Sequence, residues 1–176
     1  TTKTIEKTIN EVTRLRPSQL QTMYVHYKPG TRKYMIKMVR NEPMLDFYDR
    51  KAAFQKASEL LINSGYSRAG FESYALPDDP LTKSMKTKKA VYNSLGTQKG
   101  EATNFIAVGS SAHGVLNDEY YFQNFYEQNL YREAIDNGRF PIYRGLKMKT
   151  DDVIRREVIR HIRTFFNIEF DFFDKK

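Results

Sequence analysis

The spacing of apolar positions at the start of the chain predicts a helix followed by a strand. Residues 3–15 carry apolar side chains three or four positions apart, which is the period of one helix face. Pro17 follows, where such a helix has to be over. Residues 20–27 are β-branched and aromatic, as strands are, and residues 34–39 fit either a strand or a helix. Helix, turn and strand in this order form a unit of an α/β fold.

A second helix and two further strands extend this alternation. Asp49 can cap a helix that reaches Gly65, a residue type that commonly ends helices. Residues 66–76 follow at once and residues 104–108 come later, and both segments read as short strands. The first part of the chain is therefore predicted to alternate between helices and strands.

The middle and the end of the chain show different patterns. Residues 81–103 are rich in Lys, Ser, Thr and Gly and have no period, so we expect a long functional loop there. Apolar positions at helical spacing return over residues 119–137 and 150–166, which we expect to be helices. The chain is thus predicted to consist of an α/β part, residues 1–115, and a mostly helical part, residues 116–176.

Composition limits what the chain can do. Among its 176 residues are twelve Tyr and twelve Phe, which argues against disorder, and no cysteine, which excludes disulfides, thiolate metal sites and cysteine nucleophiles. It has 29 Lys and Arg against 21 Asp and Glu, a formal net charge of +8. That excess suits an anionic partner, although a basic soluble surface explains it more simply. No apolar run approaches the roughly 20 residues of a membrane helix, so no membrane role is predicted.

A loop of small residues is the sharpest local indication of a binding site. Residues 105–108 are an apolar segment that leads directly into residues 109–114, which are nearly all small. Ligands of α/β sheets bind beyond the carboxyl ends of parallel strands, where small residues let them approach the backbone. An ordinary turn fits this pattern as well. We expect His26 and His113 at such strand ends, where they could act as acid and base in one site, although an ordinary packed or solvent-exposed histidine explains each of them more simply. Two histidines without a third ligand do not indicate a metal.

Three arginines form a stripe on the last predicted helix. Arg156, Arg160 and Arg163 are four and three residues apart. We favour a solvent-exposed helix face on which these arginines pair with nearby acidic side chains. The second choice is binding of ligand carboxylates, and binding of nucleic acid is the least favoured. The phosphate-binding loop, the dinucleotide fingerprint and the metalloprotease and serine-hydrolase motifs do not occur in the sequence. The residues by themselves therefore leave an enzyme and a basic binding module both open.

Several short motifs, taken in order, together resemble one family. They are Arg16-Pro17-Ser18-Gln19-Leu20, Ser64-Gly65-Tyr66, Tyr74-Ala75-Leu76-Pro77-Asp78-Asp79, Gly109-Ser110-Ser111-Ala112-His113-Gly114, Tyr143-Arg144-Gly145-Leu146 and Arg155-Arg156-Glu157-Val158-Ile159. With this order and spacing, the chain resembles the C-terminal half of an oxygen-independent coproporphyrinogen III oxidase, or of a close relative among the radical S-adenosylmethionine enzymes. The resemblance covers nearly the whole chain.

The resemblance implies a fold, two cofactors and a reaction. The fold is the second part of an incomplete parallel (β/α) barrel followed by a mostly helical C-terminal domain. The cofactors are S-adenosylmethionine and a four-iron, four-sulfur cluster, whose CxxxCxxC ligands would lie in a missing N-terminal half of the same protein. The namesake reaction is the oxidative decarboxylation of propionate side chains on a tetrapyrrole of heme biosynthesis, in the cytoplasm. Because this chain has no cysteine, we predict that it binds no cluster and is inactive alone.

The loop of small residues carries part of the family's cofactor-binding pattern. In the family a Gly-x-Ser-Ala-x-Ser loop contacts S-adenosylmethionine, and Gly109, Ser111 and Ala112 match it. His113 and Gly114 depart from it, and His113 is kept as a cofactor-binding candidate. The resemblance therefore predicts a cofactor contact at this loop.

A second family segment is matched less well. The pattern Asn-Phe-Gln-Gly-Tyr falls on residues 93–97, where Asn93 and Gly96 agree but Leu95 replaces the Gln expected to bind the cofactor. His26 stands at the strand end that lines the cofactor site in the family. These departures leave open a heme-binding or heme-degrading relative, and also a non-catalytic basic module for nucleic acid or protein.

The basic charge gains a meaning from the resemblance. A tetrapyrrole carries several propionates, and lysines or arginines at the mouth of a site could pair with them. Arg144 is the substrate-binding candidate, and the lysines between Lys83 and Lys89 are further contributors. The sequence assigns no catalytic residue and no metal ligand.

Overall fold

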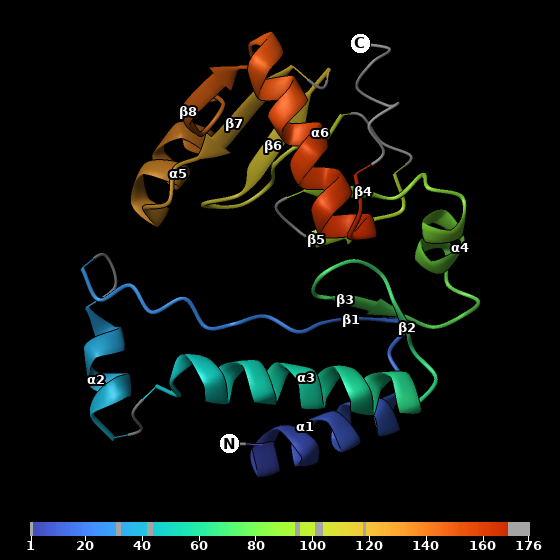
Figure 1. Cartoon of the computed structure of the whole chain (residues 1–176). Coiled ribbons are helices and arrows are strands. Elements are labelled where there is room, and N and C mark those ends of the chain that lie inside the picture. The colour runs from blue at the N-terminus through green and yellow to red at the C-terminus, as the bar shows by residue number, and fades with distance from the viewer. Residues whose placement is uncertain are drawn as a thin grey trace. The chain divides into compact units, whose positions relative to one another are not determined.

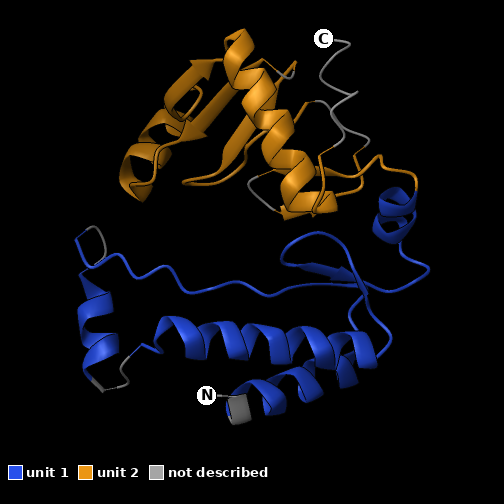
Figure 2. Cartoon of the chain, viewed as in Figure 1, with its two compact units in different colours: residues 1–86 blue, residues 87–176 orange. Residues whose placement is uncertain are grey.

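A computed structural model shows two compact units, Thr1–Lys86 and Thr87–Lys176 (Figure 2). We refer to them as unit 1 and unit 2. The structure describes residues 2–30, 33–41, 44–93, 96–100, 104–117 and 119–168. The boundary predicted near residue 115 separates a barrel portion from a domain of a longer protein, and it stays a prediction.

Unit 1 consists of helices around a small sheet (Figure 1). Its sheet has the strand order β1-β3-β2, and both pairings are antiparallel. The elements are α1 (Thr2–Leu15), β1 (Gln19–Gln21), α2 (Tyr34–Asn41), α3 (Phe47–Asn63), β2 (Ser67–Arg68), β3 (Ser73–Ala75) and α4 (Pro80–Lys86).

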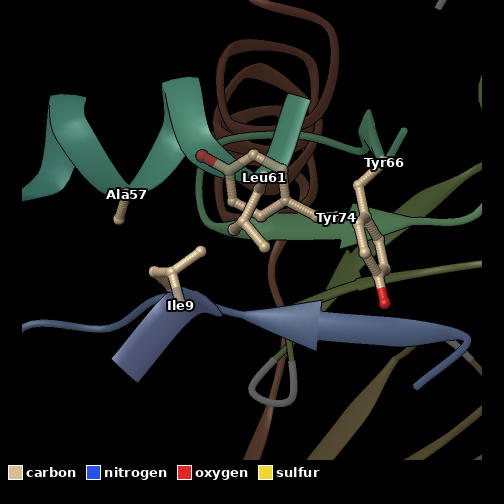
Figure 3. Packing of buried hydrophobic residues seen from close by; sticks show 5 residues of the cluster. All are labelled: Ile9, Ala57, Leu61, Tyr66 and Tyr74. Carbon is tan, nitrogen blue, oxygen red and sulfur yellow. The ribbon is translucent and has the colours of Figure 1, made fainter. Parts of the chain in front are cut away.

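The core of unit 1 lies between α1, α3 and β3. Leu61 and Tyr74 are fully buried there, and Ile9 packs against them from α1 (Figure 3). Tyr66 belongs to the same cluster, and its hydroxyl donates a hydrogen bond to the carbonyl of Pro17 at 2.7 Å. This bond joins the segment after α1 to the segment after α3. The apolar face predicted over residues 3–15 is confirmed for Ile5 and Ile9, which pack in this core, whereas Leu15 is 77% exposed.

Unit 2 consists of a hairpin and a three-stranded sheet accompanied by two helices (Figure 1). The hairpin is β4-β5, and the sheet has the order β6-β7-β8 with antiparallel pairs throughout. The elements are β4 (Val91–Asn93), β5 (Gly96–Gln98), β6 (His113–Leu116), β7 (Tyr120–Asn124), α5 (Gln128–Asp136), β8 (Ile142–Lys147) and α6 (Thr150–Phe165).

The mixed α/β class is confirmed, and so are the helices expected at both ends of the chain. The helix expected from Asp49 begins earlier, because Asp46 caps it by accepting a hydrogen bond from the amide of Asp49 at 2.8 Å. The undecided segment 34–39 is helical. Every strand pairing in the described residues is antiparallel, so the parallel barrel stays a prediction.

Three predicted strands are much shorter than expected. Only Gln19–Gln21 forms a strand in the first of them, and residues 22–28 have no regular structure. Residues 66–76 contain two short antiparallel strands in place of one. Within residues 104–108, Phe105 makes a single bridge to Val115. Each of these segments has too few backbone partners among the described residues to form a long strand.

Two predictions for the second half of the chain are wrong. Residues 119–137 are not one helix, because β7 occupies Tyr120–Asn124 and α5 begins at Gln128. Aromatic side chains at helical spacing also suit a strand, and pairing with β6 and β8 on both sides decides for the strand. Residues 81–103 are not one loop, since they include most of α4 and the hairpin β4-β5.

Candidate functional site

The loop of small residues joins residues 104–108 to β6 and has a strained backbone. Gly109 has φ +102° and Ser111 has φ +66°. The left-handed region is easily reached by glycine but costs energy for serine, so surrounding contacts must hold it. The amide of Ser111 donates to the carbonyl of Phe125 at 2.8 Å, and the amide of Gly109 donates to the Tyr131 hydroxyl at 3.0 Å.

A buried asparagine holds the inner side of this loop. Asn124 is 1 % exposed, and its side-chain amide donates to the carbonyls of Gly109 at 3.0 Å and Ala107 at 3.3 Å. Its backbone amide donates to the carbonyl of Ala112 at 2.9 Å. The pairing of β7 with β8 shifts register between Gln123 and Asn124, and such a bulge redirects a side chain. The end of β7 therefore fixes the conformation of the loop.

Three polar residues lie in one row across the sheet. His113 on β6 is paired with Gln123 on β7, which is paired with Arg144 on β8. Directly paired residues point to the same face, so His113 and Arg144 are about 10 Å apart on one face, two strand spacings. Gln123 connects them to the loop, because its amide donates to the carbonyl of Ser111 at 3.3 Å.

Arg144 is oriented by a neutral partner. Its Nε and Nη2 donate to the side-chain oxygen of Gln123 at 3.0 and 2.7 Å, and its guanidinium lies 5.8 Å from the Tyr143 ring centre. Gln123 fixes the geometry without cancelling the charge. Within the described part of the chain no carboxylate forms an ion pair with Arg144, which is therefore available to bind an anion.

A shallow pocket of about 370 Å³ opens on the same face of this sheet. Two positions along the strands from the polar row, a second row on the same face is formed by Val115, Tyr121 and Leu146. Tyr121 and Leu146 line the pocket. The lining residues are Tyr92, Asn93, Tyr121, Leu146, Met148, Asp152, Arg155, Arg156 and Ile159. The predicted cofactor residue Asn93 therefore lies in unit 2 beside the sheet that carries His113 and Arg144.

Asn93 and Gly96 are brought together within unit 2, whereas His26 belongs to unit 1. Asn93 and Gly96 are paired across the β4-β5 hairpin, and Gly96 is buried with φ +92°. Leu95 lies outside the described residues. His26 is an exposed residue of the irregular segment 22–28 in unit 1. The structure thus gathers the candidates of unit 2 around one sheet and hairpin and leaves His26 in the other unit.

The arginine stripe of α6 is used inside unit 2. Glu157 is 8 % exposed and pairs with Arg160 at 2.8 Å and Arg156 at 3.3 Å. Arg163 donates to the Tyr92 hydroxyl at 2.8 Å and lies 4.8 Å from that ring centre. The pairing with acidic side chains is confirmed, but the expected solvated face is wrong, because these side chains are largely enclosed.

No metal centre is present in the described residues, where no group of three or more His, Cys, Asp or Glu side chains is placed to hold an ion. The whole chain has no cysteine. An iron–sulfur cluster therefore does not fit this chain. In the described part of the chain, none of the helices combines the length and apolarity needed to cross a membrane.

Comparison with known proteins gives first a class of fold. The structure superimposes on the solved coproporphyrinogen III oxidase of Escherichia coli, a radical SAM enzyme, with a TM-score of 0.82 and 24% identity. The match covers 97% of this chain and 39% of that one. This chain therefore has the fold of the part of that solved chain which the match covers.

The relatives identify a particular kind of enzyme. The oxygen-independent coproporphyrinogen III oxidase of Pseudomonas aeruginosa is 30% identical over 166 residues, which are 94% of this chain and 35% of the relative. The enzyme of the same name from Helicobacter pylori is 26% identical over 171 residues, which are 97% of this chain and 37% of the relative. No protein-family model matches the chain. The predicted resemblance to this group of oxidases is confirmed, and the chain spans about a third of the length of these relatives.

Proposed function

We propose that this chain forms part of a radical S-adenosylmethionine oxidoreductase that acts on a tetrapyrrole of heme biosynthesis, in the cytoplasm. The observation that carries the proposal is the match to oxygen-independent coproporphyrinogen III oxidases over 94% of the chain, together with the same fold. The loop that includes Gly109, Ser111 and Ala112 has a conformation fixed from below by Asn124, as a cofactor contact requires.

The chain contributes the later part of an incomplete parallel barrel and the domain that follows it. Extended segments with exposed apolar side chains support this role in each unit. In unit 1, Met23 and Val25 are 61% and 53% exposed. In unit 2, Ile106 and Val108 are 77% and 84% exposed. Strands of parallel sheets have apolar side chains on both faces, so such segments suit neighbouring strands supplied by the rest of the enzyme, which is the proposed partner.

S-adenosylmethionine and a four-iron, four-sulfur cluster supply the radical chemistry, and this chain contributes to binding only the first. The candidates are the loop residues Gly109, Ser111 and Ala112 with His113, the hairpin residues Asn93 and Gly96, and His26 in unit 1. The small loop residues let a ligand approach the backbone. The cluster needs thiolates that the sequence does not contain, so its ligands belong to another part of the enzyme.

Arg144 is proposed to bind a propionate of the substrate. A carboxylate facing the guanidinium forms charge-assisted hydrogen bonds, and Gln123 already holds the side chain in place. A fixed arginine loses less conformational freedom on binding, which favours affinity. A nucleic-acid module is disfavoured, because the arginine stripe of α6 is engaged with Glu157 and Tyr92.

The experiment is a chimera in which this chain replaces the matching third of the Pseudomonas aeruginosa oxidase. The chimera should hold a cluster and consume coproporphyrinogen III without oxygen. Arg144→Ala should raise the KM for that substrate about tenfold, the value of one charged hydrogen bond, with little change in cluster content. Arg139→Ala is the matched control, since Arg139 is exposed and pairs with Glu133 at 3.9 Å.

Two outcomes would redirect the proposal. A chimera that has an intact cluster and bound S-adenosylmethionine but leaves coproporphyrinogen III unchanged would contradict the proposed substrate assignment. A Soret shift when heme is added, reduced by His26→Ala or His113→Ala, would instead favour a heme-binding or heme-degrading relative. Equal KM values for the Arg144 and Arg139 variants would contradict the carboxylate contact.

A further inference from the structure

The loop that carries Gly109 and Ser111 uses most of its backbone amides internally. Gly109, Ser111 and Ala112 donate to the Tyr131 hydroxyl, the Phe125 carbonyl and the Gly109 carbonyl, respectively. Between Gly109 and Ala112 the exception is Ser110, which is exposed and whose amide has no acceptor among the described residues. The amide of Ser110 is therefore a donor available to a ligand.

Asn124 helps to determine which way this donor points, together with the Ala112 amide, which donates to the same Gly109 carbonyl at 3.4 Å. The carbonyl of Gly109 and the amide of Ser110 belong to one planar trans peptide, so they point in opposite directions. The buried side chain of Asn124 holds that carbonyl inward at 3.0 Å. The amide of Ser110 must then point outward.

Gly109 cannot fix this orientation by itself. A glycine reaches conformations on either side of φ = 0 with similar ease, so the peptide after it can turn over at little cost. The hydrogen bonds from Asn124 to the Gly109 carbonyl and from the Gly109 amide to Tyr131 hold both sides of the residue. Together they select one of the two peptide orientations.

We propose that Asn124 and Tyr131 are positioning residues, and that they hold the Gly109–Ser110 peptide so that the Ser110 amide donates a hydrogen bond to S-adenosylmethionine. The inference rests on the proposed function and adds three residues that the resemblance does not assign. The recognised group is an acceptor atom of the cofactor, either a carboxylate oxygen or a ring nitrogen. The side chain of Ser110 is not needed, because the donor is its backbone.

The orientation is tested on the 176-residue chain by amide hydrogen exchange followed by NMR, which needs no cofactor. The amides of Gly109 and Ser111 should exchange slowly, and that of Ser110 should exchange at least about tenfold faster. Asn124→Asp replaces the donor amide by a carboxylate that repels both carbonyls, and Tyr131→Phe removes one acceptor but keeps the ring. Each should raise exchange at Gly109, while Asn137→Ala, which removes an exposed bond to Glu133, should not.

The role toward the cofactor is tested in the chimera by equilibrium dialysis with S-adenosylmethionine. Asn124→Asp should weaken binding about tenfold at unchanged cluster content, and Asn137→Ala should not. Slow exchange at Ser110, or equal affinity in the two variants, would overturn the inference while the proposed function stands. A wild-type chimera that holds a cluster but binds no S-adenosylmethionine would overturn the proposed function and the cofactor role with it.

Discussion

At the scale of single residues, the sheet of unit 2 has one position where only glycine fits. A Cβ atom on Gly114 would overlap the ring of Phe122 and lie 2.7 Å from the carbonyl oxygen of Phe105. The Phe105 carbonyl also accepts the hydrogen bond of the Val115 amide at 2.8 Å, so it cannot move away freely. Gly114 therefore permits the close contact between β6 and the segment that leads into the loop.

Gly114→Ala should destabilise the chain by about 1–3 kcal/mol, the usual cost of overpacking. Chemical denaturation monitored by circular dichroism measures this free energy of unfolding. Gly30→Ala is the control, because a Cβ atom on Gly30 would meet nothing within 4 Å. Equal stability of the two variants would show that β6 and residues 104–108 are not packed as described.

Tyr126 should titrate at a higher pH than an ordinary tyrosine. A hydrogen bond to the Glu127 side chain, and then the charge of that carboxylate, raise the pKa of Tyr126. Because folding raises this pKa, the contact between Tyr126 and Glu127 stabilises the folded chain at pH values below the ordinary tyrosine pKa. That contribution to stability is lost as the pH rises through the folded-state pKa. Glu127→Gln should lower the pKa, as measured by NMR of ring-labelled tyrosine, and an unchanged midpoint would contradict the contact.

At the scale of elements, α6 is attached to the β4-β5 hairpin through its charged side chains. Arg160 pairs with Glu157 and donates to the carbonyl of Ala90 at 3.3 Å, and Arg163 reaches Tyr92. Glu157 is buried, so its charge is balanced by the two arginines beside it. The arginine stripe therefore has a structural role in holding the helix to the hairpin.

Glu157→Gln should lower the free energy of unfolding by about 1.5–3 kcal/mol, because two enclosed arginines lose a charged partner. Asp151→Asn removes an ion pair in which the side chains of Asp151 and Arg155 are 68% and 73% exposed. This change should lower the free energy of unfolding by at most about 0.5 kcal/mol. Thermal and chemical denaturation of both variants checks the difference. A larger effect of the exposed pair would contradict the network.

The elements also show what could be predicted from the sequence and what could not. Helices α1, α3 and α6 follow from local apolar periodicity, and each is found. Strand β7 was expected to be helical, because the spacing of its aromatic residues fits both periods and its pairing depends on distant strands. Strand β8 was not predicted either, because its pairing also depends on a strand that is distant in the sequence.

The candidate site was predicted only in part. The small-residue loop stands out locally, so Gly109 and Ser111 could be named in advance. Asn124 and Tyr131 act on that loop from more than ten residues away. Asn124 lies at a bulge that exists only once β7 and β8 are paired, and Tyr131 reaches the loop from α5. The available signal was Asn124, a polar residue among the aromatic residues of the segment 120–126. It indicates a buried polar contact only when that segment is interpreted as a strand.

At the scale of the whole molecule, the chain contains the proposed binding residues but not the ligands of the proposed cluster. It has no cysteine, and it spans about a third of the length of the oxidases it resembles. Reconstitution of this chain alone with iron and sulfide should therefore give no iron–sulfur absorption. An absorption band of one cluster per chain would contradict the assignment of the ligands to another part of the enzyme.

The central claim is that this chain supplies the cofactor loop and the substrate arginine of a radical S-adenosylmethionine oxidase. The most direct measurement is anaerobic turnover of coproporphyrinogen III by the Pseudomonas aeruginosa chimera, followed by the carbon dioxide released. We expect turnover that requires S-adenosylmethionine and falls in the Arg144→Ala variant at low substrate. A folded chimera with a full cluster and bound S-adenosylmethionine that releases no carbon dioxide would contradict the account.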